Sequence, residues 1–129
     1  MSDAQATMAD KAKSTLLWVI TILAALAMGA AGVTKFTAPD MWNELFTGWG
    51  YSVGFKSLIG ALEVVGAGLV LVPAFATYAA TVLVAIMIGA VYTLMTNPSD
   101  MGLVVPMANV VLFAIIAFAR RNDRWTPGS

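Results

Sequence analysis

The chain has 129 residues, of which 60% are hydrophobic and 11% are charged, and its formal net charge is zero. Soluble globular proteins carry roughly 25% charged and about 45–50% apolar residues, so this composition excludes an ordinary soluble domain and indicates a membrane protein. The absence of Cys and His excludes disulfides, metal sites built from those residues and His-dependent acid–base catalysis, and the balanced charge argues against nucleic-acid binding.

The first predicted elements are a polar N-terminal tail at 1–14 and four apolar stretches, at 15–33, 57–72, 75–95 and 103–119. About 20 apolar residues cross a hydrocarbon core about 30 Å thick, and the only charged residue inside these stretches is Glu63. With their polar flanks they predict transmembrane helices at about 15–35, 55–72, 75–95 and 102–120. Residues 15–119 thus predict an all-α membrane domain, an antiparallel bundle of four transmembrane helices, with a C-terminal tail at 121–129.

A secretory signal peptide is the alternative interpretation of the first stretch, because Lys11 and Lys13 precede it and small residues lie at 27–31. The apolar core of a signal peptide has about 7–15 residues. The first stretch is longer than that, and three more apolar stretches follow it. We therefore favour a membrane helix.

A short helix is predicted at about 40–48, in the long connection between the first two spans. Its aromatic face carries Trp42, Phe46 and the following Trp49, and its opposite face is polar. A helix of this kind lies flat at a membrane surface. It is either an interfacial anchor or a lid over a site in the bundle, and the pattern fits both.

The other two connections are short, since Pro73 separates the second and third stretches and turn formers at 96–100 separate the third and fourth. Consecutive helices should then be antiparallel, with both termini on one side. Five basic residues share that side and two lie opposite: Lys11, Lys13, Arg120, Arg121 and Arg124 against Lys35 and Lys56. The positive-inside rule predicts a multi-pass protein of the cell membrane with cytoplasmic N- and C-termini.

Glu63 is the residue that most needs an explanation. Gly60, Gly66 and Ala67 lie three or four residues away on the same helical face. Small residues allow a second helix to approach closely, so this face is predicted to lie inside the bundle. Burying an ionisable group there costs on the order of 3 kcal/mol, which makes Glu63 a functional candidate. A protonated Glu63 in an interhelical hydrogen bond is the structural alternative.

Four more polar side chains are predicted at a similar depth, in the outer half of the bundle: Lys35, Tyr92, Thr93 and Asn109. Lys35 is placed to pair with Glu63, and the others could hydrogen-bond to the pair. Each also has a structural interpretation, as a snorkelling lysine, a belt tyrosine or an interhelical amide. In the inner half, Ala25, Gly29, Ala85 and Gly89 are typical of a packing seam.

Several motifs occur in a characteristic order: GVTKF at 32–36, WGY at 49–51, IGALEVVGA at 59–67 and GAVYT at 89–93. In these the chain resembles the DoxX and DoxX-like family from about Gly29 to the fourth helix. The resemblance implies a small four-helix membrane protein in which Lys35 and Glu63 occupy the family's Lys and Glu positions. The chain departs from many relatives at Ser52, where they carry Pro, and at Leu94 and its neighbours, where they carry His.

The biology of the family is uneven, since some members are tied to thiosulfate oxidation with quinone as acceptor and others to oxidative-stress complexes. The resemblance therefore implies a non-catalytic accessory subunit of a membrane redox assembly, with an oxidoreductase subunit or a second copy of the chain as partner. A bound quinone is the expected ligand, and no intrinsic cofactor, metal ligand or catalytic residue is assigned. Two alternatives stay open: an assembly factor for membrane proteins, and a small proton or solute carrier resting on Glu63.

Overall fold

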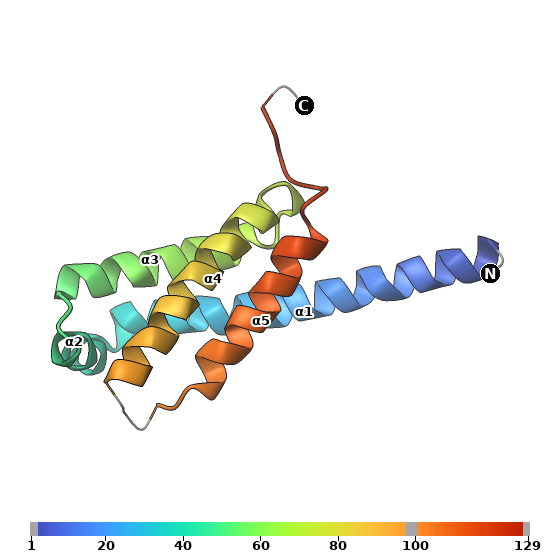
Figure 1. Ribbon diagram of the computed structural model, residues 1–129. Helices are drawn as coiled ribbons and strands as arrows, with labels where there is room; N and C mark the ends of the chain where they lie inside the picture. The colour runs from blue at the N-terminus through green and yellow to red at the C-terminus, as the bar shows by residue number, and fades with distance from the viewer. Residues whose placement is uncertain (1–2, 98–100, 128–129) are drawn as a thin grey trace.

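The computed structural model describes residues 3–97 and 101–127. These residues form five helices and, within the same ranges, no strand: α1 (Asp3–Thr37), α2 (Pro39–Gly48), α3 (Val53–Leu69), α4 (Pro73–Thr96) and α5 (Val104–Ala119) (Figure 1). The all-α prediction is confirmed. The described part of the predicted N-terminal tail is helical, because α1 begins at Asp3. Part of the predicted turn at 96–100 lies outside the described residues.

The helix boundaries follow from residues that start or stop a helix. Pro39 and Pro73 occupy the first position of α2 and α4, where a missing N–H costs no hydrogen bond. The Ser52 hydroxyl accepts a hydrogen bond of 3.0 Å from the Phe55 N–H and caps α3. Gly50, with φ of 93°, lets the chain turn sharply between α2 and α3.

The helices form two closely packed pairs, α1 with α3 and α4 with α5. Contacts between the pairs are fewer, and they link α3 to α4 and α1 to α5. Figure 1 shows α2 at one end of the helix bundle and the turn from α3 to α4 at the other, with the N-terminal half of α1 projecting beyond it. From that turn α3 and α4 diverge toward α2, so the two pairs separate most where α2 lies.

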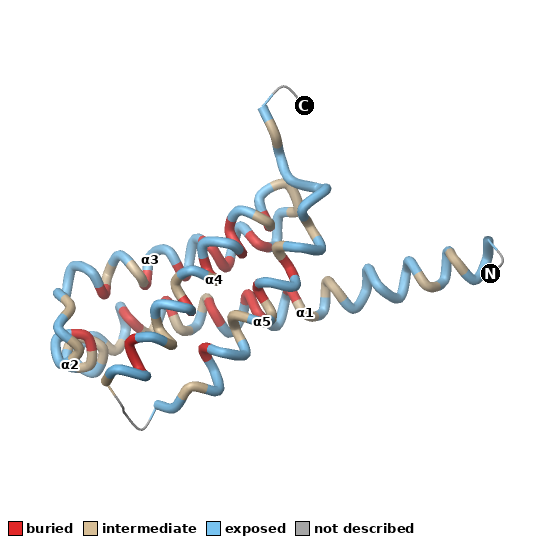
Figure 2. Tube along the Cα trace, viewed as in Figure 1, coloured by how far each residue is buried: buried red, intermediate tan, exposed pale blue. Residues whose placement is uncertain are grey.

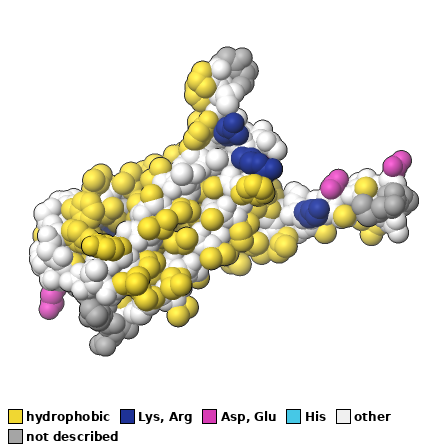
Figure 3. Space-filling model, viewed as in Figure 1, with side chains coloured by type: hydrophobic (Ala, Val, Ile, Leu, Met, Phe, Trp, Pro, Cys, Tyr) yellow, Lys and Arg dark blue, Asp and Glu magenta, His cyan; other side chains and the backbone are white. Residues whose placement is uncertain are grey.

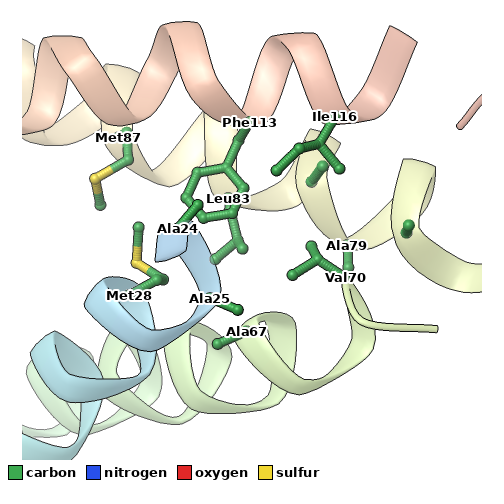
Figure 4. Packing of buried hydrophobic residues seen from close by; sticks show 12 residues of the cluster. Ala24, Ala25, Met28, Ala67, Val70, Ala79, Leu83, Met87, Phe113 and Ile116 are labelled. Atoms are coloured by element: carbon green, nitrogen blue, oxygen red, sulfur yellow. The ribbon is translucent and has the colours of Figure 1, made fainter. Parts of the chain in front are cut away.

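The hydrophobic core lies toward the α3–α4 turn and uses small residues where helices meet. Figure 4 shows Leu83 and Phe113 beside Ala24 and Ala25, with Met28 and Met87 next to them. Buried positions on α1 begin only at Thr21, which matches the uncovered N-terminal half of α1 in Figure 2. Because alanine side chains are short, the helix axes can approach closely here.

The outer surface is unusually apolar, and Figure 3 shows hydrophobic side chains spread over α4 and α5 with charged groups at the ends. Large residues such as Leu26, Val105 and Phe118 are each 67% exposed. A surface of this kind is stable when lipid, not water, surrounds it. By length and composition α1 and α4 can each cross a membrane, and α2 with α3 can count as one further span bent by 117°. α5 is apolar but has only 16 residues.

The C-terminal segment closes the end opposite α2. The Trp125 N–H donates a hydrogen bond of 2.8 Å to the Ala74 carbonyl, and the Tyr78 hydroxyl donates to the Trp125 carbonyl. The Arg120 guanidinium lies 4.8 Å from the centre of the Trp18 ring. Trp18 and Trp125 therefore lie at this end, far from Trp42 and Trp49 at the α2 end.

Candidate functional site

The centre of the candidate site is a buried ion pair between α1 and α3. Lys35 Nζ lies 2.7 Å from Glu63 Oε1, and the two side chains are 6% and 2% exposed. Among residues 3–97 and 101–127, no hydrogen-bond donor with good geometry reaches Glu63 Oε1, so the ion pair is its only polar contact. A buried pair is stable only when both partners are present, because either charge alone would be left without compensation.

Two glycines bring the ion pair together by letting the α1 and α3 backbones touch. A Cβ atom at Gly32 would lie 2.8 Å from the Gly60 carbonyl oxygen and 3.0 Å from Glu63 Cβ. A Cβ atom at Gly60 would lie 3.1 Å from Lys35 Cβ. Real Cβ atoms essentially never approach other atoms within 3.0 Å, so only glycine fits at Gly32, while a Cβ atom at Gly60 would require its neighbours to shift by a few tenths of an ångström. The close approach sets the distance between the lysine and the carboxylate.

The helix α2 also contacts the ion pair. The Lys35 ammonium lies 4.1 Å from the centre of the Trp42 ring, a cation–π contact. The Trp42 indole N–H donates a hydrogen bond of 3.2 Å to Thr34 Oγ1 on α1. The hydrogen bond to Thr34 therefore holds the Trp42 ring in place against the Lys35 ammonium.

A second buried lysine, Lys56 on α3, lies beside the pair, although its sequence position indicated only a basic residue on the side opposite the termini. Its Nζ donates a hydrogen bond of 3.0 Å to the Lys35 carbonyl in the last turn of α1. The free carbonyls at a helix C-terminus carry partial negative charge, which a cation stabilises. The signal that could have found it is spacing, since Lys56, Gly60 and Glu63 share one helical face.

Next to the ion pair lies a cavity of about 680 Å³, bounded by α1, α3, α4 and α5 and covered by α2 at one end. This volume is typical of sites for small organic ligands. The polar side chains that line it are Lys35, Glu63, Thr93, Asn109 and Tyr51. Most of the other lining residues are apolar, such as Met28, Ile59 and Leu94.

The cover of the cavity is an aromatic cluster centred on Phe46. The Phe46 ring centre lies 6.1 Å from that of Trp42, 5.3 Å from Trp49 and 6.0 Å from Tyr51. Phe55, on α3, packs 5.0 Å from Tyr51. Aromatic pairs at these separations are attractive beyond their burial, so the cover is a packed surface.

The remaining predicted site residues separate into two groups. Thr93 and Asn109 line the cavity. Thr93 Oγ1 is 2.8 Å from the Tyr51 hydroxyl, and within residues 3–97 and 101–127 the Asn109 amide donates only to the Met87 sulfur, at 3.8 Å. Tyr92, in contrast, is 67% exposed and does not line the cavity. The predicted grouping of Tyr92 with the pair therefore does not match the structure, because Tyr92 points about 100° around the α4 axis from Thr93.

The four small residues of the predicted packing seam also separate. Ala25 is buried in the core, and a Cβ atom at Gly29 would make ordinary contact, 3.6 Å, with Ala67. Ala85 and Gly89 on α4 line the cavity instead, and a Cβ atom at Gly89 would meet nothing within 4 Å. Of the four residues, therefore, only Ala25 and Gly29 on α1 lie where two helices pack together.

The contact between Tyr51 and Thr93 predicts a matched pair of variants. Replacing Tyr51 with Phe removes the hydrogen bond that joins the α2–α3 connection to α4, and we expect it to lower the free energy of unfolding by about 1 kcal/mol. The same change at exposed Tyr92 should alter it by less than about 0.5 kcal/mol. Unfolding in mixed detergent micelles measures both, and equal effects would contradict the assignment.

The donor set of the site favours an uncharged or weakly polar ligand. Within the described part of the chain, no three His, Cys, Asp or Glu side chains gather as metal ligands. The ion pair is neutral as a unit, the Asn109 amide donates to a weak acceptor, the Met87 sulfur, and the Glu63 carboxylate keeps acceptor sites beside its contact with Lys35. Buried polar groups of this kind are what a ligand's carbonyl or hydroxyl can satisfy.

In comparison with known proteins, a family model described as the DoxX-like family matches residues 19–119. No curated protein and no solved structure matches the chain. The matched range begins within α1 and ends at the last residue of α5. It therefore includes the ion pair and every residue that lines the cavity.

Proposed function

Since the chain belongs to the DoxX-like family, we propose that it is a non-catalytic accessory subunit of a membrane redox or oxidative-stress assembly that binds a quinone. The observation that carries the proposal is the cavity of about 680 Å³ with the Lys35–Glu63 pair in its wall. Its apolar lining suits a lipophilic ring, and its few polar groups suit the oxygen atoms of that ring.

Particular side chains would hold each form of the ligand. A quinone carbonyl accepts hydrogen bonds, which the Lys35 ammonium and the Asn109 amide can donate. A quinol hydroxyl can donate to Glu63, whose Oε1 has no other donor among the described residues than Lys35. Because the chain has no Cys and no His, the proposal gives it a binding role and leaves electron transfer to a partner subunit.

The proposal includes four membrane spans, α1, α3, α4 and α5, with both termini in the cytoplasm. At a rise of 1.5 Å per residue α3 is about 26 Å long and α5 about 24 Å long, slightly less than a hydrocarbon core of about 30 Å. Polar flanks and local thinning can cover such a difference at modest cost. Support for the orientation is the five-to-two division of basic residues.

The test is the composition of what copurifies with the protein. The full chain is extracted with its surrounding lipid in a polymer nanodisc, and bound quinone is measured by mass spectrometry per mole of protein. We expect near-stoichiometric quinone with the parent chain and its loss in the Lys35→Met, Glu63→Gln double variant, which removes both charges together. Tyr92→Phe, outside the cavity, is the control and should retain the quinone.

Two results would contradict this function. Absence of both quinone and an oxidoreductase partner, with diverse membrane proteins copurifying instead, would favour the assembly factor. Proton or solute flux in proteoliposomes that depends on Glu63 would favour the carrier.

A further inference from the structure

The wall of the cavity is incomplete between α3 and α4. On that side four lining residues are exposed, although they border an interior space: Phe55 on α3, and Val82, Ala85 and Gly89 on α4. Phe55 and Val82 are large side chains, 39% and 46% exposed, so the cavity borders the outer surface where they lie. Three further exposed lining residues are at or just before the start of α5: Met101, Gly102 and Val105.

The divergence of α3 and α4 produces this opening. The two helices are joined by the short connection at 70–72 and separate toward α2 (Figure 1). Small side chains widen the gap on the α4 side. A Cβ atom at Gly89 would have no neighbour within 4 Å, so the space beside it is unfilled.

The depth of the opening in the bilayer determines whether it faces acyl chains, headgroups or water. Gly89 lies seven residues before Thr96, the end of α4, which corresponds to about 10 Å along the helix axis. In a core about 30 Å thick that position is surrounded by acyl chains rather than by headgroups or water. The charged side chains in Figure 3 lie at the ends of the molecule, away from this region.

An independent observation points to a ligand inside. The Glu63 side chain is 2% exposed and lines the cavity, and among the described residues the polar contact of its Oε1 is the ion pair with Lys35, at 2.7 Å. A carboxylate has about four acceptor sites, so one contact with an ammonium leaves sites that a ligand can use. A polar group that enters the cavity from the opening would meet this oxygen and Lys35.

We propose that the cavity takes an amphiphilic ligand from the bilayer, with its polar head at the Lys35–Glu63 pair and its hydrocarbon tail leaving between α3 and α4 across Ala85 and Gly89. This inference rests on the proposed function, since it assigns the class of quinone and its route. A long apolar tail then adds to the affinity of the head, and the head reaches the ion pair without passing through water.

The experiment compares two probes that share one ring: a dimethoxy-methyl-benzoquinone with a ten-carbon tail, and the same ring without the tail. Quinones quench tryptophan fluorescence, and Trp42 and Trp49 line the cavity. Replacing the distant Trp18 and Trp125 with Phe leaves these two as reporters. Saturable quenching of the full chain in lipid nanodiscs then gives a Kd for each probe.

The test variant is Gly89→Leu, which fills the gap, and its matched control is Gly68→Leu. Gly68 is also an exposed helical glycine whose Cβ would meet nothing within 4 Å, but it lies outside this cavity. We expect Gly89→Leu to raise the Kd of the tailed probe at least about tenfold, the effect of a modest steric clash. The Kd of the tailless probe should change by less than about twofold, and Gly68→Leu should change neither. Ala85→Leu, one turn earlier on α4, should repeat the selective effect.

Each other outcome overturns the inference in a recognisable way. If the parent chain binds neither probe, the proposed function fails and the inference fails with it. If Gly89→Leu weakens both probes equally, or neither, the cavity still binds quinone but the tail does not leave between α3 and α4. An equal loss in Gly68→Leu would show a general effect of added bulk and would also overturn it.

Discussion

Replacing Glu63 with Gln will lower the free energy of unfolding by about 3 kcal/mol, because it leaves the Lys35 ammonium buried without a counter-charge. The ammonium is 2.7 Å from the carboxylate, and among the described residues no other carboxylate forms an ion pair with it. Its contact with the Trp42 ring compensates for only part of the loss. Unfolding of the full chain in mixed detergent micelles gives the measurement.

A double-mutant cycle separates the ion pair from general damage to the bundle. The Lys35→Met, Glu63→Gln double variant removes both charges and should recover most of the stability that Glu63→Gln loses. If the losses of the two single variants simply add in the double variant, the pair does not contribute as a pair. Quinone measured on the same samples shows whether the charges also serve binding, since a stable double variant that has lost quinone separates the two roles.

Replacing Gly32 with Ala will have the next largest effect, a loss of about 1–3 kcal/mol from overpacking. The added Cβ would lie 2.8 Å from the Gly60 carbonyl oxygen and 2.8 Å from Val64 Cγ2. Because the first of these atoms belongs to the backbone of α3, the clash can be relieved only by moving the helices apart. The same movement would lengthen the Lys35–Glu63 distance, so we also expect weaker quinone binding.

The control for this prediction is Gly29→Ala, one turn earlier on α1. Its Cβ would make an ordinary contact of 3.6 Å with Ala67, so no clash arises. Alanine has a higher helix propensity than glycine, by about 1 kcal/mol in water, and the variant should be at least as stable as the parent chain. A Gly32→Ala variant as stable as Gly29→Ala would contradict the close crossing of α1 and α3.

The arrangement of charges explains why the site lies where it does. Lys35, Glu63 and Lys56 are all buried at the end covered by α2, and together they carry one more positive than negative charge. The Lys56 ammonium donates to the Lys35 carbonyl at the C-terminal end of α1, and no carboxylate among the described residues forms an ion pair with it. This leaves the carboxylate of Glu63 to Lys35 and to whatever enters the cavity.

The amino-acid sequence by itself determines that this chain is helical and lipid-facing, where the helices begin and end to within a few residues, and which family it belongs to. Long apolar runs are helical in lipid because every backbone polar group must be hydrogen-bonded within the segment. Proline and glycine positions then fix most of the breaks. The exception is α1, which continues to Asp3 because nothing in residues 3–14 breaks a helix.

Only the tertiary structure decides which side chains reach the cavity, and adjacent residues of α4 show the reason. Tyr92 and Thr93 lie at the same depth, yet Thr93 is buried beside Tyr51 and Tyr92 is exposed. α4 is apolar on every side, so its sequence has no periodic signal for the rotation of the helix about its axis. That rotation, and with it the opening beside Gly89, is set by how α3 and α5 pack against α4.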